Sequence, residues 1–115
     1  MVLDSPDPRR LAHFYSDLLG WEISSESDEG AALAPSDGVA YLSMQLSPDY
    51  VRPTWPNVDG AQQMMLHLDF EVSDLAEATA HAVELGGQVA EFQPQDNVRV
   101  VLDLDGHPFC LYVAD

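Results

Sequence analysis

The sequence predicts an α+β domain that contains two copies of one βαβββ module. Two segments repeat one another at a fixed spacing of 67 residues, and three pairs of residues align: Asp7 with Asp74, Leu18 with Leu85, and Gly20 with Gly87. In both copies an Asp precedes a helical pattern that ends at glycine and continues into a strand-like segment. A repeat of this length that occurs only twice is too long and too rare for a solenoid. It indicates a duplicated supersecondary module.

The first copy carries helix signals at both ends. Asp7 is a suitable N-cap, and Pro8 fits the first helical position, where no backbone N–H is needed for an intrahelical hydrogen bond. Gly20 supplies the C-terminal stop. Between these ends, apolar residues recur at helical spacing: Leu11, Phe14, Tyr15, Leu18 and Leu19. In the second copy, Asp74 and Glu77 resemble a capping box, and Gly86-Gly87 ends the helix.

The remaining segments predict strands. In the first half they cover residues 21–24, 31–33 and 39–46, and in the second half residues 66–72, 88–92, 98–104 and 108–113. Turns are expected at 35–38, Pro-Ser-Asp-Gly, and at Asp105-Gly106. Each half then reads β-α-β-β-β. We expect one domain over residues 1–115, with a module at 1–50, a module at 62–115, and a linker at 51–61 that is rich in proline.

The charge balance excludes several classes of partner. The chain has 20 acidic residues against four Arg and no Lys, which gives a net charge of -16. Such an acidic protein repels a phosphate backbone and an anionic lipid surface over a Debye length of ~8 Å, so we expect neither nucleic-acid nor membrane binding. A single cysteine and the lack of a visible signal peptide favour a reducing, cytoplasmic location.

Two sequence motifs resemble those of a known family. The first, at 7–21, reads D-P-R-R-L-A-x-F-Y-x-x-L-L-G-W, and the second, at 103–111, reads D-L-D-G-H-P-F-C-L. With the duplicated module, they resemble the vicinal oxygen chelate superfamily of glyoxalases, bleomycin-resistance proteins and ring-cleaving dioxygenases, and in particular its small glyoxalase-like domains. The resemblance implies that the two modules form a curled eight-stranded mixed sheet, a cup with both helices outside. It does not imply a particular reaction, because one fold hosts many functions.

The resemblance to metal-dependent members of this superfamily implies four metal-ligand positions. One lies on the first strand and one on the last strand of each module. His67 matches the first-strand position of the second module, and Cys110 stands where the family has a carboxylate on the last strand. Gln45 is the counterpart of Cys110 in the first half. Subtracting the 67-residue spacing from His67 places its counterpart before Met1. An amide, an imidazole and a thiol without a carboxylate suit Mg, Mn, Ni or Fe(II) poorly.

We therefore expect no resident cofactor and no stoichiometric metal; a divalent metal remains the alternative, with His67, Gln45 and Cys110 as its ligands. His67 is the one candidate catalytic residue, since an imidazole can act as an acid or a base near neutral pH. The expected ligand site consists of His67, Gln45 and Cys110, with Tyr41, Met44 and Trp55 at its wall or mouth.

Two functions follow as hypotheses. The first is a glyoxalase-like protein with a degenerate metal site that binds or sequesters a small, partly apolar ligand. The alternative is a metal-dependent lyase, isomerase or dioxygenase of the same superfamily, with the missing ligand supplied from elsewhere. The resemblance also implies a homodimer, because small curled sheets of this superfamily often pair and a chain of 115 residues has limited surface to close both sheet edges itself.

Overall fold

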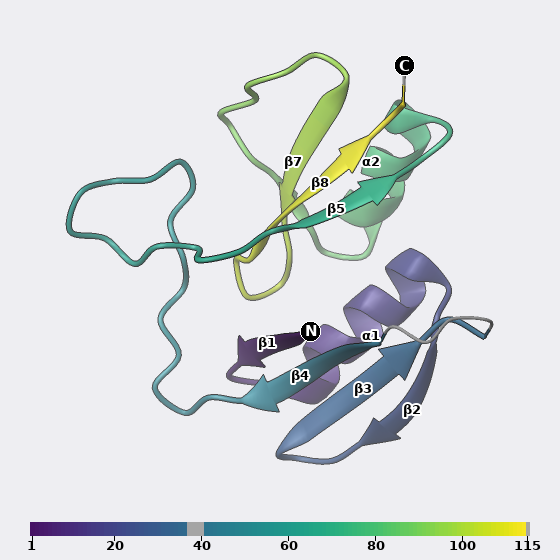
Figure 1. The fold of residues 1–115 in the computed structure, drawn as a ribbon, viewed down its shortest axis with the longest axis vertical. Coiled ribbons are helices and arrows are strands. Elements are labelled where there is room, and N and C mark those ends of the chain that lie inside the picture. The colour runs from purple at the N-terminus through teal and green to yellow at the C-terminus, as the bar shows by residue number, and fades with distance from the viewer. Residues whose placement is uncertain (37–40, 115) are drawn as a thin grey trace. The chain divides into compact units, whose positions relative to one another are not determined.

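The computed structural model describes residues 1–36 and 41–114. The chain divides into two compact units, Met1–Tyr50 and Val51–Asp115. In the described residues, each unit contains four strands and one helix in the order β-α-β-β-β (Figure 1). The predicted α+β class and the two βαβββ modules are confirmed, and the eight strands are divided between two four-stranded mixed sheets.

The first unit contains five elements: β1 (Val2–Ser5), α1 (Pro8–Leu19), β2 (Glu22–Glu26), β3 (Gly30–Ala34) and β4 (Leu42–Leu46). Its strand order is β1-β4-β3-β2. The β1–β4 pair is parallel, and the other two pairs are antiparallel. The helix therefore follows a strand that pairs with the last strand of the module.

The second unit repeats this topology with β5 (Leu68–Glu71), α2 (Leu75–Glu84), β6 (Gln88–Val89), β7 (Val98–Leu102) and β8 (Pro108–Tyr112). Its strand order is β5-β8-β7-β6, and again only the first strand pairs in parallel with the last. The duplication that the sequence predicts thus extends to the strand order and the strand directions.

Both predicted N-caps are present. The carboxylate of Asp7 accepts a hydrogen bond from the backbone N–H of Arg10 at 3.3 Å, and Asp74 accepts one from that of Glu77 at 3.0 Å. The left-handed backbone of Gly20, with φ of 73°, ends α1. These bonds satisfy N–H groups that the first helical turn leaves without an intrahelical partner.

One face of each sheet packs against its helix. The other face, called the open face here, carries exposed side chains such as Gln45 and Asp69, although Val100 of β7 is buried on it. In the first unit, alternate residues of β3 and β4 are buried, with Leu33, Leu42 and Met44 between 0% and 4% exposed. Helix α1 covers this face with Leu11 and Tyr15, both fully buried (Figure 1). Successive strand residues point to opposite faces, so the residues between the buried ones lie on the open face.

Some predicted strands are shorter in the structure. β5 begins at Leu68 rather than at residue 66, since Met65 adopts a left-handed backbone with φ of 64°. β6 ends at Val89. Beyond it, the backbone N–H of Ala90 donates to the Val100 carbonyl, and the Gln93 side chain bonds both the N–H and the C=O of Val100. β4 begins at Leu42, and the first part of its predicted range and of the 35–38 turn lies outside the described residues.

The predicted turn at Asp105-Gly106 is present between β7 and β8. Gly106 has a φ of 87°, and its N–H donates to the carbonyl of Asp103 at 3.1 Å. Neither helix in the described part of the chain is long and apolar enough to cross a membrane.

Candidate functional site

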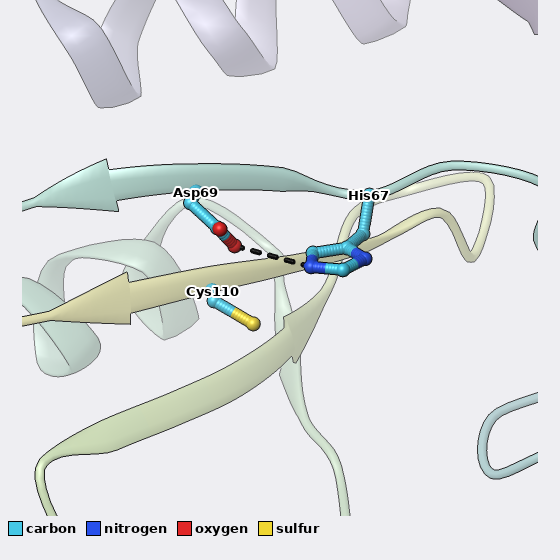
Figure 2. Close-up of side chains that lie close together, drawn as sticks. All are labelled: His67, Asp69 and Cys110. Atoms are coloured by element: carbon cyan, nitrogen blue, oxygen red, sulfur yellow. Dashed lines mark ion pairs between the residues drawn. The ribbon is translucent and has the colours of Figure 1, made fainter.

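Three side chains with metal-ligand or acid–base chemistry converge on the open face of the second sheet. Asp69 on β5 pairs directly with Cys110 on β8, and His67 lies just before β5. Figure 2 shows the three side chains pointing toward one another. His67 Nε2 lies 3.3 Å from Asp69 Oδ1, and one donor atom from each of the three residues lies within 4.8 Å of the others.

The apolar residues of these strands decide which side chains reach this face. Phe109 and Leu111 are 0% and 2% exposed on the helix side of β8, which leaves Cys110 on the open side. On β5, the Phe70 ring packs edge-on against Phe109 at 6.0 Å, so Asp69 points the opposite way. The strand alternation therefore brings a carboxylate and a thiol to the same face.

The thiol of Cys110 is held in its protonated form. Burial, the negative charge of Asp69 and a hydrogen bond to the Asp69 carboxylate raise the pKa of Cys110 from 9.0 to about 11. A thiol is nucleophilic only as the thiolate. Cys110 is therefore a poor nucleophile at neutral pH.

The three residues are part of the lining of an open pocket of about 260 Å³. The rest of its lining consists of Gln95, Asn97, Val98 and Tyr112. Amide groups, a phenol and an apolar side chain thus surround the imidazole, the carboxylate and the thiol. A few polar groups among apolar surface are the usual composition of a small-molecule site.

The strand register corrects the expected counterpart of His67 in the first unit. Asp4 pairs with Gln45 in the same way as Asp69 pairs with Cys110, which supports Gln45 as the counterpart of Cys110. At this register His67 corresponds to Val2, not to a position before Met1. The reason is that the segment between Asp69 and the N-cap of α2 is two residues longer than the segment between Asp4 and the N-cap of α1.

The other predicted site residues are not among those that line this pocket of the second unit. Gln45 is exposed on the open face of β4, in a pocket of about 440 Å³ that belongs to the first unit. Met44 is 2% exposed in the core, and Tyr41 is 58% exposed. Trp55 packs against Phe92, with ring centroids 6.1 Å apart, and donates its indole N–H to the Phe92 carbonyl. The participation of these four residues in one ligand site with His67 stays a prediction.

Sequence reasoning missed Asp69, although its signal is in the sequence. His67 and Asp69 are two residues apart in a segment predicted as a strand, and that spacing places side chains on one face. The expectation of a metal-free site depended on a donor set without a carboxylate. Because Asp69 supplies one beside His67 and Cys110, that reason no longer holds.

The comparisons with known proteins identify the family. The sequence profile of the glyoxalase-like domain matches residues 1–112. The chain belongs to the glyoxalase-like domain family. The predicted resemblance to the vicinal oxygen chelate superfamily is thereby confirmed, although no curated protein matches the chain.

Several solved structures have a similar fold. An enzyme of the glyoxalase/bleomycin resistance protein/dioxygenase family from Burkholderia phytofirmans has a TM-score of 0.71 at 13% identity, covering 98% of this chain and 94% of that one. The fosfomycin resistance protein FosX from Mesorhizobium loti has a TM-score of 0.71 at 13% identity, covering 100% and 89%. The lactoylglutathione lyase from Agrobacterium tumefaciens has a TM-score of 0.65 at 16% identity, covering 99% and 90%.

The donors at the four family positions do not fit an oxygen-rich metal site. Val2 offers no donor, Gln45 offers a neutral amide, and Cys110 offers a thiol in place of a carboxylate. Mg²⁺ and Mn²⁺ favour carboxylate, carbonyl and water oxygens. The glyoxalase-like domain described here therefore departs from the family pattern at three of the four positions.

Proposed function

We propose that this glyoxalase-like protein binds a small, partly apolar molecule in the pocket on the open face of β5 and β8. The observation that carries the proposal is the pocket of about 260 Å³ in which His67, Asp69 and Cys110 converge beside Val98 and Tyr112. His67 and Asp69 offer hydrogen bonds that orient a ligand, and Tyr112 offers a ring for an aromatic group to contact.

The charge of the site favours neutral or cationic ligands. The Asp69 carboxylate lies in the pocket, the Cys110 thiol is protonated, and the whole chain carries a net charge of -16. Such a field attracts cations and repels polyanions. Cationic aromatic compounds are therefore the preferred class, and the micromolar affinity that we expect corresponds to about -8 kcal/mol.

A second candidate function is that of a metal-dependent lyase, isomerase or dioxygenase. It is favoured by the three converging donors, and the names of the similar FosX and lactoylglutathione lyase structures include a resistance protein and a lyase. In that case His67 is a metal ligand rather than an acid or base. We further propose that the protein acts in the cytoplasm as a homodimer.

A binding screen tests the first candidate. Chelator-treated protein is titrated calorimetrically with a panel of neutral and cationic aromatic compounds, so that ligand binding is measured without metal. We expect at least one micromolar ligand whose affinity falls about 10-fold in Tyr112→Ala and His67→Ala. The matched control is His13→Ala, since His13 is also an exposed imidazole beside a carboxylate, with Nε2 2.9 Å from Glu26.

Three outcomes are decisive. Binding that survives both pocket substitutions places the ligand elsewhere and overturns the proposed site. A panel that gives no heat of binding overturns the binding function itself. Binding that appears only after a divalent metal is added favours the metal-dependent candidate instead.

A further inference from the structure

The loop between β6 and β7 forms one border of the pocket in the second unit. Residues 90–97 are called the pocket loop, and Gln95 and Asn97 near its end belong to the pocket lining. We propose that Gln95 and Asn97 determine specificity by binding an amide group of the ligand with their carboxamides, and that Arg99 positions both of them. This inference rests on the small-molecule binding proposed above, and it names the chemical class of that ligand.

The backbone at the end of the pocket loop is held from two sides. One guanidinium nitrogen of Arg99 donates to three backbone carbonyls at 2.8 to 3.3 Å, those of Gln95, Asp96 and Val98. From the other side, the backbone N–H of Val113 donates to the Asn97 carbonyl at 3.3 Å. The backbone that carries the two carboxamides is therefore ordered before a ligand arrives, which reduces the entropy lost on binding.

Charge alone would direct an arginine of this chain to a carboxylate, because four Arg face 20 acidic residues. Arg9 on α1 follows this expectation and lies 3.5 Å from the Asp28 carboxylate. Among the residues that the structure describes, Arg99 forms no ion pair and donates to the backbone of the pocket loop instead. Its planar guanidinium thus stabilises the conformation of the loop.

Gln93 holds the beginning of the pocket loop. Its Nε2 donates to the Ala90 and Val100 carbonyls at 2.7 and 3.0 Å, and its Oε1 accepts from the Val100 N–H at 2.9 Å. The carboxamide thus lies between the Val100 N–H and the Ala90 carbonyl, which would bond directly in a continued antiparallel ladder. From Glu91 to Asn97 it is the one side chain that is not exposed. Both ends of the loop are therefore fixed by side chains.

The carboxamides of Gln95 and Asn97 are available to a ligand. In the described part of the chain neither of them forms a hydrogen bond, in contrast to the carboxamide of Gln93. A carboxamide offers an acceptor oxygen and two N–H donors. Two carboxamides on one border of a pocket therefore match a ligand group that has both a donor and an acceptor, as an amide does. An ester matches them less well because it has no N–H.

The rest of the pocket lining determines the other features of the ligand. The Asp69 carboxylate offers an acceptor to an ammonium group, and the Tyr112 ring offers an aromatic face. A cationic aromatic amide therefore provides a partner for each kind of group in the pocket. The amide is the feature that the pocket loop adds to the ligand class proposed above.

A matched pair of probes tests amide recognition. The full chain, treated with chelator, is titrated calorimetrically with para-aminomethylbenzamide and with methyl para-aminomethylbenzoate. The second probe has the same ring and ammonium group but carries an ester in place of the amide. We expect the amide to bind about 10-fold more tightly, which is the effect of one net hydrogen bond. The affinity of the ester reports whether the rest of the pocket is intact.

Substitutions then assign the roles. Gln95→Ala and Asn97→Ala should each reduce the preference for the amide, and the double variant should abolish it, while the affinity of the ester stays unchanged. Arg99→Ala should reduce the preference although both carboxamides remain, as expected of a positioning residue. The matched controls are Gln63→Ala, at an exposed position outside the pocket lining, and Arg9→Ala. Both should keep the native preference. Circular dichroism confirms that each variant is folded.

Equal affinity of the two probes for the native chain overturns amide recognition, and so does a failure of both probes to bind at millimolar concentration. The binding function proposed above fails only if its whole panel gives no heat, so the two proposals fail separately. A preference that survives the double variant overturns the role of Gln95 and Asn97. The positioning role of Arg99 is overturned if Arg99→Ala keeps the preference, or if it weakens the binding of both probes equally.

Discussion

Asp69 stands directly opposite Cys110 in the parallel ladder of β5 and β8, and its carboxylate lies beside the thiol. The two residues are far apart in the sequence, and their pairing joins the first and the last strand of the second module. This relationship sets the protonation state of the thiol, because burial and the charge of Asp69 raise its pKa to about 11. The first two predictions concern this pair.

Asp69→Asn should make Cys110 more reactive. The substitution removes a negative charge beside the thiol and so lowers its pKa, although burial keeps that pKa above the ordinary 9.0. The rate of alkylation by iodoacetamide, measured across the alkaline range in metal-free protein, should rise at lower pH in the variant. Glu71→Gln is the control, since Glu71 lies on the same strand opposite Tyr112. Identical pH–rate profiles for the native protein and Asp69→Asn would contradict the assigned cause.

The same pKa shift predicts how stability depends on pH. In the unfolded chain the thiol ionises at 9.0, whereas in the folded protein it ionises at about 11. The unfolded state therefore binds fewer protons above pH 9, and the contribution of this group to stability is lost as the pH rises toward 11. Urea unfolding of the native protein and of Cys110→Ala should show a steeper alkaline decline for the native protein. The prediction would be refuted if the free energy of unfolding declined equally with pH in both proteins.

Asp103→Ala should destabilise the second unit by about 2–4 kcal/mol. The Asp103 side chain is fully buried, and its Oδ1 accepts from the backbone N–H groups of Asp105 and His107 at 2.9 and 3.0 Å. Its Oδ2 also lies 2.8 Å from Nδ1 of His107. Removal of the carboxylate takes the acceptor away from two part-buried N–H groups. Urea denaturation measures the free energy of unfolding, and Asp59→Ala, at an exposed position, is the control. An equal loss of stability in both variants would contradict the prediction.

The protein is expected to form a homodimer. Each four-stranded sheet has edge strands, β1 and β2 in the first unit and β5 and β6 in the second, and unpaired edges favour association with another sheet. Multi-angle light scattering should give twice the chain mass of 12.6 kDa at micromolar concentration. A monomer mass across that concentration range would rule the dimer out.

Local sequence signals were sufficient for the helices, the modules and the family. Asp7 and Asp74 cap their helices as predicted, since a cap depends on hydrogen bonds that span only three residues. The Asp105-Gly106 turn is equally local. The ends of β5 and β6 were harder to predict, because Met65 and Gln93 adopt arrangements that no short pattern indicates.

The sequence by itself determined the α+β class, the two βαβββ modules, and the presence of His67 and Cys110 at family positions. Only the tertiary structure decided that Asp69 joins them and that Val2, not a position before Met1, corresponds to His67. The physical reason is that a parallel ladder pairs residues far apart in the chain. Its register is set by which side chains each strand buries, as Phe109 and Leu111 do on β8, and not by the spacing of the repeat.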